Sequence, residues 1–296
     1  MSSKPQIIIT GASGLIGSRT LSLLAADYTL TPLRSADDGR VDITDQRALK
    51  SALEQYPQAT AMIHLAAFTD VNAAWQQQGD KLAPAWQTNV VGSQHIAKAC
   101  QKRGWYLLYT STAFVFSGDK EGLYTEADSP APIEWYGQTK AASEEIILNA
   151  GGKNVILRID QPFTHLPFKK ADTLHRVING LQQGTLYPQF SNHFFGPTYI
   201  DDLVKIFSWC LKHQPQGIYH ASSGEQWSDF AFAQMVADTL EINASVTKGD
   251  LQAYLQTIQR PYQKNTAMDN SKLKAALDFP LLTIKQAVAK AKNYVH

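Results

Sequence analysis

The chain has 296 residues, a formal net charge of +1 and 44% hydrophobic residues, and its mean hydropathy is −0.25. This length can bury a sizeable core, as one large domain or as a nucleotide-binding domain with a smaller partner. The balanced charge gives no support for a nucleic-acid partner, and no apolar run approaches the roughly 20 residues that span a bilayer. The two cysteines, Cys100 and Cys210, are far apart and lack a metal-binding spacing. We therefore expect a cytoplasmic protein with reduced thiols, and no membrane or nucleic-acid partner.

Short apolar runs alternate with amphipathic segments through the first half of the chain, a pattern typical of a parallel sheet covered by helices. The predicted strands are 6–10, 28–33, 61–66, 105–110 and 154–158. The predicted helices between them are 15–26, 45–55, 85–103 and 135–150, with the Thr44 hydroxyl as a candidate cap of the second. The sequence thus predicts an α/β fold with a doubly wound parallel sheet of the Rossmann type.

After Arg158 the alternation becomes irregular, with prolines and phenylalanines interrupting it as far as about residue 197. It recovers with a predicted helix at 201–212 and a strand at 217–221, and further helices follow near 228–240 and 284–294. We expect residues 1–160 and about 198–221 to form the nucleotide-binding domain. Residues 161–197 and 222–296 would form a smaller, C-terminal substrate-binding cap.

A glycine turn lies between the first predicted strand and the first predicted helix. Glycines 11, 14 and 17 allow the backbone to turn tightly and to approach a pyrophosphate, which the positive end of the helix attracts. The spacing is Gly-x-x-Gly-x-x-Gly, which differs from the Gly-x-Gly-x-x-Gly of many dehydrogenases. The cofactor-binding residues that we expect here are Gly11, Ser13, Gly14, Leu15, Ile16 and Gly17.

The end of the second strand indicates which dinucleotide is bound. A carboxylate there binds the adenosine ribose of NAD, whereas an arginine accommodates the additional phosphate of NADP. The chain has Arg34 and Ser35 at this point and no acidic residue before Asp37. NADP is therefore the preferred prediction and NAD the alternative.

Other segments are also candidates for the dinucleotide. Asp42 and Ile43, before the second helix, are placed to contact the adenine. The small residues that end the third strand, Leu65, Ala66 and Ala67, would let the cofactor ribose lie against the backbone. His64, directly before them, is interpreted as a structural histidine.

Tyr136 and Lys140 lie four residues apart, on one face of the predicted helix 135–150. A free tyrosine has a pKa of about 10 and is a poor acid at neutral pH. A neighbouring ammonium, together with oxidised nicotinamide, would favour the phenolate and lower that pKa. Tyr136 could then give a proton to a carbonyl oxygen as hydride arrives, while Lys140 would hold the nicotinamide ribose. Of the hydroxyls that end the fourth strand, Thr112 is the candidate third member of the set.

These motifs resemble those of the extended short-chain dehydrogenase/reductases, and within them the dTDP-4-dehydrorhamnose reductase group. The similar segments are Thr-Gly-Ala-Ser-Gly-Leu-Ile-Gly at 10–17, Ser-Thr-x-x-Val-Phe at 111–116, Tyr-Gly-x-Thr-Lys at 136–140, and later segments as far as Arg260-Pro261. The resemblance implies a nucleotide domain with a C-terminal substrate domain, and Thr112, Tyr136 and Lys140 as the catalytic set. It also implies that Asn89 lies in the helix behind the site and contributes to the cofactor pocket.

The departures from the family pattern fall around the substrate. The reductase pattern has an aspartate where this chain has Ala113, and a glutamate where it has Trp75. The family usually carries a tryptophan after the fifth strand's arginine, but here Arg158 is followed by Ile159-Asp160-Gln161-Pro162-Phe163. The candidate substrate-side residues are Thr69, Arg158, Gln161, Phe163, Tyr199 and Arg260. We therefore expect reduction of a 4-keto nucleotide sugar by NADPH and leave the identity of the sugar open.

Two other functions stay open. Ala113 suits a nucleotide-sugar 4-epimerase, although Arg34 argues against the NAD that epimerases hold. The missing carboxylates argue against a dehydratase. A non-catalytic NADP-binding regulatory subunit is the second alternative, against which the intact Thr112, Tyr136 and Lys140 argue. No metal site is expected, and a homodimer through helices 85–103 and 135–150 is an expectation by analogy.

Overall fold

In a computed structural model of the chain, residues 4–34 and 39–295 are described. They form two compact units, which we treat separately. The first unit comprises residues up to Val115, then Glu134–Leu157 and Val204–Tyr219. The second comprises Phe116–Ile133, Arg158–Leu203 and residues from His220 onward. Residues 116–133, which the sequence analysis assigns to the nucleotide-binding domain, cluster with the second unit.

The first unit is built on a six-stranded sheet in the order β10-β5-β4-β3-β1-β2. The strands are β1 (Gln6–Thr10), β2 (Thr29–Pro32), β3 (Ala59–His64), β4 (Tyr106–Thr112), β5 (Asn154–Ile159) and β10 (Gly217–His220). The pairs β1–β2, β1–β3 and β3–β4 are parallel. Strand order reverses at β1 and β3, and in doubly wound sheets ligands bind beyond the carboxyl ends of the strands at this switch point. The predicted α/β fold is confirmed.

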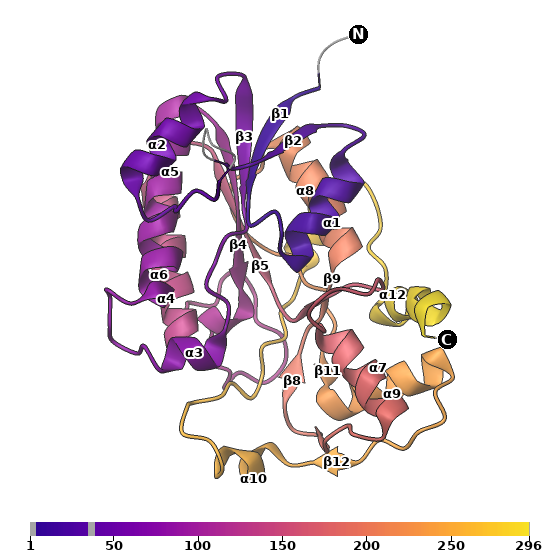
Figure 1. The fold of residues 1–296 in the computed structure, drawn as a ribbon. Coiled ribbons are helices and arrows are strands. Elements are labelled where there is room, and N and C mark those ends of the chain that lie inside the picture. The colour runs from indigo at the N-terminus through magenta and orange to yellow at the C-terminus, as the bar shows by residue number, and fades with distance from the viewer. Residues whose placement is uncertain (1–3, 35–38, 296) are drawn as a thin grey trace. The chain divides into compact units, whose positions relative to one another are not determined.

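Helices cover both faces of this sheet (Figure 1). On one face lie α2 (Gln46–Glu54), α5 (Ser93–Arg103) and α6 (Trp135–Asn149), and on the other lie α1 (Leu15–Leu24) and α8 (Ile200–His213). Short elements precede α5, namely α3 (Val71–Trp75), α4 (Pro84–Trp86) and a π-helix, η1 (Gln87–Gly92), and a 3₁₀ turn, η2 (Ala113–Val115), follows β4. The predicted single helix over 85–103 is therefore three consecutive segments. The apolar sides of α2, α5 and β3 meet in a core that includes Leu53, Ile96 and Met62.

The cap of α2 differs from the prediction. Asp45, not Thr44, is the N-cap, because its carboxylate accepts hydrogen bonds from the amides of Arg47 and Ala48. The Thr44 hydroxyl instead donates to the Asp42 carboxylate at 2.8 Å. A carboxylate at the N-cap also complements the positive end of the helix dipole, so it is the stronger of the two neighbouring candidates.

The second unit contains helices α7 (Thr173–Gln183), α9 (Asp229–Leu240), α10 (Leu251–Leu255), α11 (Ser271–Ala276) and α12 (Ile284–Ala289), with a 3₁₀ turn, η3 (Lys290–Tyr294), after α12. Three two-stranded sheets pair β6 (Pro162–Phe163) with β9 (Thr198–Tyr199), β7 (Gln189–Phe190) with β12 (Lys248–Gly249), and β8 (Phe194–Phe195) with β11 (Trp227–Ser228). Helices α7, α9 and α12 share one apolar core, which includes Leu174, Val236 and Val288.

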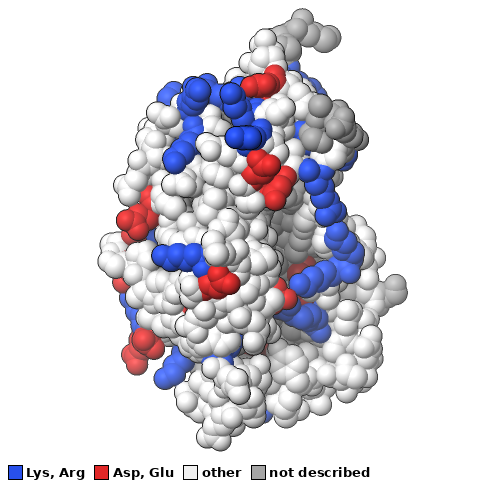
Figure 2. All heavy atoms as spheres, turned by 60° about the vertical axis from the view of Figure 1, so that its left-hand side comes forward, with Lys and Arg blue, Asp and Glu red and all other residues white. Residues whose placement is uncertain are grey.

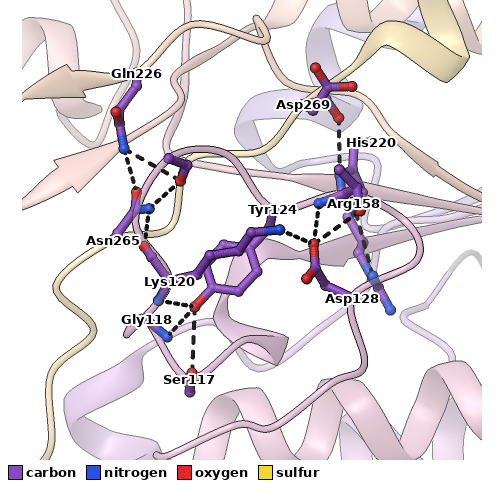
Figure 3. A network of polar contacts seen from close by, with 12 residues as sticks. Ser117, Gly118, Lys120, Tyr124, Asp128, Arg158, His220, Gln226, Asn265 and Asp269 are labelled. Atoms are coloured by element: carbon purple, nitrogen blue, oxygen red, sulfur yellow. Dashed lines mark hydrogen bonds and ion pairs between the residues drawn. The ribbon is translucent and has the colours of Figure 1, made fainter.

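The segment 116–128 is fastened to the segment 263–269 within the second unit (Figure 3). The Tyr124 hydroxyl accepts hydrogen bonds from the amides of Gly118 and Lys120, at 2.9 and 3.1 Å. The Asn265 side chain donates to the carbonyls of Lys120 and Gly122, at 2.9 and 2.6 Å. We call this set of contacts the Tyr124–Asn265 clasp. It ties an 18-residue excursion, which lies between Val115 and Glu134 of the first unit, to the second unit.

Both basic and acidic side chains lie on the face that Figure 2 shows, with wide uncharged areas between them. Within residues 4–34 and 39–295, no helix is long and apolar enough to cross a membrane.

Candidate functional site

The glycine turn follows β1 and brings the backbone close to the end of β3. Gly11 has φ +68°, which favours glycine, and a Cβ there would lie 2.7 Å from the amide nitrogen of Ala66. A Cβ on Gly17 would lie 2.2 Å from the Gly11 carbonyl oxygen. Gly14 is the N-cap of α1, and no side chain of the described residues caps this helix. The first amides of α1 are thus left for an anion, which is the arrangement that a pyrophosphate requires.

The residues predicted to bind the adenosine half of the cofactor differ in how exposed they are. Arg34 is exposed and pairs by backbone with Arg40, and Ser35 lies outside the described residues. Asp42 is exposed and its carboxylate accepts the Thr44 amide. Ile43 is buried in the core and packs against Gly92, where a Cβ would lie 2.6 Å from its side chain. Leu65, Ala66 and Ala67 follow β3 and are half-buried.

His64 is fully buried in a chain of hydrogen bonds between Thr10 and Ser93. Its Nδ1 lies 2.7 Å from the Thr10 hydroxyl, and its Nε2 lies 3.0 Å from the Ser93 hydroxyl. The Thr10 oxygen already accepts the amides of Leu65 and Ala66, so its one proton goes to His64 Nδ1. The proton of a neutral imidazole is then on Nε2, which donates to Ser93. Burial lowers the pKa of His64 to about 3, so the ring stays neutral, in keeping with a structural histidine.

Asn89 lies in η1 and joins three segments. Its side chain accepts the Phe68 amide, donates to the Phe68 carbonyl, and donates to the Thr139 hydroxyl of α6 at 2.8 Å. Thr139 in turn donates to the Tyr136 carbonyl. Asn89 therefore stands behind the first turn of α6, and the π-helix that carries it fits the frequent occurrence of π-bulges at functional sites.

Thr112, Tyr136 and Lys140 lie together in the first unit. Lys140 is 3% exposed, donates to the Thr110 carbonyl at 2.8 Å, and lies 4.1 Å from the centre of the Tyr109 ring. Thr112, at the end of β4, is 7% exposed, and its hydroxyl is close enough to the Tyr136 phenol to favour the phenolate through a hydrogen bond. The side chains of the Tyr-x-x-x-Lys motif thus lie beside the Thr112 hydroxyl at the end of β4.

The charges around Tyr136 act in opposite directions. Burial raises the pKa of Tyr136 above its usual value, and the Lys140 ammonium lowers it as expected, but burial is the larger effect in the protein chain itself. Burial likewise lowers the pKa of Lys140, and Tyr136 opposes that change. The Glu134 carboxylate, fully buried, accepts the amides of Tyr136 and Gly137 at 2.8 and 2.6 Å. Glu134 therefore caps the helix that carries both Tyr136 and Lys140, and the sequence analysis did not identify it.

Of the predicted substrate-side residues, Thr69 is exposed in the first unit and the others lie in the second. Arg158 is 1% exposed, with its guanidinium 5.0 Å from the Phe116 ring and 3.4 Å from His220 Nε2. Phe163 is fully buried in the core beside Phe232.

The remaining candidates of the second unit are at least partly buried. The Tyr199 hydroxyl is 2.7 Å from His165 Nδ1. Gln161 has φ +36° and its side chain accepts a hydrogen bond from the Thr173 hydroxyl. The Arg260 guanidinium lies 4.8 Å from the Tyr262 ring.

Asp160 was missed by the sequence analysis. It directly follows β5 and is 1% exposed. One carboxylate oxygen, Oδ2, accepts the Gly196 amide at 2.9 Å and the Thr266 hydroxyl at 2.7 Å. An acidic residue directly after a buried apolar strand was the signal that could have identified it.

Comparison with known proteins decides the family. The family described as RmlD substrate binding domain matches residues 5–295. The chain belongs to that family. A dTDP-4-dehydrorhamnose reductase of Aggregatibacter actinomycetemcomitans is 27% identical, over 98% of this chain and 99% of that protein.

Two further matches bear on the fold and on the range of functions that it carries. The crystal structure of a Bacillus anthracis dTDP-4-dehydrorhamnose reductase in complex with NADP superposes with a TM-score of 0.87 at 23% identity, covering 99% of this chain and 100% of that one. The rat methionine adenosyltransferase 2 subunit beta is 24% identical, over 90% of this chain and 81% of that protein. The RmlD-type fold of this chain is therefore shared by proteins named for different functions.

Proposed function

We propose that this protein reduces the keto group of a 4-keto nucleotide sugar with NADPH. The observation that carries the proposal is the meeting of Thr112, Tyr136 and Lys140 in the first unit, in a family whose members include dTDP-4-dehydrorhamnose reductases. NADPH would supply the hydride, and the glycine turn at Gly11 and Gly17 with the uncapped start of α1 fits its pyrophosphate.

The residues of the chain supply the proton and the geometry. Tyr136 would give its phenolic proton to the carbonyl oxygen, and the hydride that bound NADPH supplies would go to the carbonyl carbon, so that the ketone becomes a secondary alcohol. Thr112 donates a hydrogen bond to the same oxygen and orients it. Lys140 stabilises the phenolate that Tyr136 leaves behind, because an ammonium in a buried site favours a neighbouring anion. Arg34, with Ser35, is the candidate contact for the 2′-phosphate.

NADPH oxidation with dTDP-4-keto-6-deoxyhexose tests the proposal, with NADH and a Tyr136→Phe variant measured in parallel. We expect turnover to be faster with NADPH than with NADH. In Tyr136→Phe, kcat should fall by about two to four orders of magnitude, the usual range for loss of a general acid. An Arg34→Ala variant should reduce the preference for NADPH over NADH. Turnover that is unchanged in Tyr136→Phe would refute the assignment of the proton donor.

A regulatory role is the second candidate, because the rat relative is named as a subunit of another enzyme. Such a protein would bind NADPH without turning over keto sugars, and Tyr136→Phe would leave its function intact. The same assay separates the two candidates.

A further inference from the structure

Lys140 must carry a positive charge to stabilise the Tyr136 phenolate, and its surroundings disfavour that charge. Its side chain is 3% exposed, and burial lowers the pKa of its ammonium. The Thr110 carbonyl accepts a hydrogen bond from one of the three donors of this group, at 2.8 Å. An ammonium that has lost its water needs further compensating groups, since it otherwise gives up its proton. The groups that lie around Lys140 therefore decide whether it stays charged.

The titratable groups that face Lys140 come from three elements. On α6 they are Tyr136, one turn before Lys140, and Glu144, one turn after it, and both raise the pKa of Lys140. His64 ends β3 and is neutral, because its pKa is lowered to about 3. Tyr109 lies on β4, and its ring is directly beneath the ammonium. Tyr136 changes its charge in the reaction, so the constant support of the ammonium has to come from the other groups.

The contact between Lys140 and Tyr109 has the geometry of a cation–π interaction. Nζ lies over the ring at 4.1 Å from its centre, well within the limit of about 6 Å for a significant contact. The electron-rich face of the ring attracts the cation, and the attraction is stronger where water is excluded. Tyr109 is 1% exposed, so both partners are shielded from water. The ring face therefore replaces part of the hydration that burial removes from Lys140.

The Tyr109 ring is held in place from the neighbouring strand. His64 is the register partner of Tyr109 on β3, and the two ring centres are 5.5 Å apart with an interplanar angle of 35°. His64 is in turn fixed by the hydroxyls of Thr10 and Ser93, at 2.7 and 3.0 Å. The face of the Tyr109 ring is thus a fixed surface beneath Lys140.

We propose that Tyr109 is a positioning residue for the reduction, because the face of its ring holds the Lys140 ammonium in its charged form beside Tyr136. This inference rests on the proposed function and adds a residue that acts through Lys140. The support runs from His64 through Tyr109 to Lys140 and lies entirely within the first unit. With a weaker ring face, Lys140 would lose its proton more readily, and the Tyr136 phenolate would lose its cation.

Fluorination of the ring tests the proposal with little change in its shape. Tyr109→Phe is the reference, and mono-, di- and trifluorinated phenylalanines introduced at position 109 have a progressively less negative ring face. We expect kcat for dTDP-4-keto-6-deoxyhexose, at saturating NADPH, to fall in that order, by about 5- to 30-fold over the series. A role of the ring in packing alone would leave kcat equal along the series, and that result would overturn the proposal.

Titration of Lys140 makes the test independent of turnover. NMR of isotope-labelled lysine side chains follows the ammonium, and the signal that disappears in Lys140→Arg is that of Lys140. The pKa of Lys140 should fall along the fluorinated series and should be lower in Tyr109→Leu than in Tyr109→Phe. If the wild type turns over no keto sugar, the proposed function fails, and this titration alone decides the role of Tyr109. Equal pKa values along the series would overturn the proposal in either case.

Tyr106→Phe and Tyr106→Leu are the matched controls. Tyr106 is another buried tyrosine of β4, 1% exposed, and its hydroxyl donates to the Pro215 carbonyl at 2.7 Å. It lies three residues before Tyr109 and therefore on the opposite face of the strand. Both substitutions should lower the melting temperature and leave the pKa of Lys140 unchanged. A shift in Tyr106→Leu as large as that in Tyr109→Leu would show a general loosening of β4 and would overturn the proposal.

Discussion

Lys140 and Asp160 are buried ions in different units, and they differ in how completely their charged groups are hydrogen-bonded. Lys140 is surrounded by groups that suit a cation, namely the Thr110 carbonyl, the Tyr109 ring and the Tyr136 phenol. Asp160 has donors on one oxygen and no partner among the described residues on the other. A satisfied buried ion serves its neighbour, in this case Tyr136. A half-satisfied one costs the folded state free energy, because its second oxygen has lost water without gaining a donor.

The two units also differ in how their polar groups are brought together. In the first unit, the candidate cofactor-binding and catalytic residues lie in short sequence motifs such as 11–17 and 136–140. In the second, contacts such as that between Asn265 and Lys120 join segments 145 residues apart. Chemistry in the first unit should therefore be sensitive to single side chains, whereas the second unit should lose stability when a clasp between segments is removed.

The largest effect is expected at Lys140. In Lys140→Met the phenolate of Tyr136 loses its cation, so kcat should fall by about 10²- to 10⁴-fold. Lys140→Arg is the control, since it keeps the charge but not the compact ammonium, and it should retain more activity. Steady-state kinetics at saturating NADPH measures both. Equal kcat values for the methionine and arginine variants would show that charge at this position is unimportant.

The second unit should respond through stability. Asn265→Ala removes the donor to the carbonyls of Lys120 and Gly122, and so removes two hydrogen bonds that are partly shielded from water. We expect a loss of about 1–3 kcal/mol in the free energy of unfolding, measured by urea denaturation. Asn265→Asp keeps the size but not the donors and should be no better than alanine. Unchanged stability in both variants would mean that the Tyr124–Asn265 clasp is not needed for folding.

Glu134 both caps α6 and affects the pKa of Tyr136. Its carboxylate raises the pKa of Tyr136 through charge, so in Glu134→Gln the pKa of that phenol should be lower than in the wild type. The amide oxygen of glutamine can still accept one hydrogen bond, so the helix loses only part of its cap, about 1 kcal/mol. Titration of the phenol by ultraviolet difference absorbance, with Tyr136→Phe to identify its signal, measures the shift. A shift to higher pH would contradict the assigned direction.

Much of the first unit could be predicted because its signals are local. The glycine turn, the apolar strands and the pair of Tyr136 and Lys140 each lie within a few residues. The π-helix η1 interrupts a regular helical pattern and has no comparable local signal. Helix α7 did have one, with Leu174, Val177, Ile178 and Leu181 on one face, Asp172 as its cap and Gly184 after its end, but the prolines around it suggested an irregular region. The hydrogen-bond partners of Asp160 could not be predicted from sequence, since they lie up to 106 residues away.

The smallest effect is expected at Asp128, which pairs with Lys120 beside the clasp (Figure 3). Lys120 lies 2.6 Å from its carboxylate and, with the Thr125 amide, lowers the pKa of Asp128 to about 2. A carboxyl with a lowered pKa in the folded state stabilises the protein above its unfolded value of about 4, and that stability is lost as pH falls toward 2. Asp128 and Lys120 are 28% and 36% exposed, so solvent screening limits the contribution of the ion pair to less than about 1 kcal/mol.

The free energy of unfolding of Asp128→Asn should therefore fall less steeply than that of the wild type as the pH is lowered from 4 to 2. At pH 7 the two free energies should differ only slightly. Lys120→Met should raise the pKa of Asp128 and move the loss of stability to higher pH. Urea unfolding at a series of pH values measures both. Parallel curves for wild type and Asp128→Asn below pH 4 would show that the ion pair does not stabilise the clasp. The uncharged hydrogen bonds that Tyr124 accepts and Asn265 donates would then suffice.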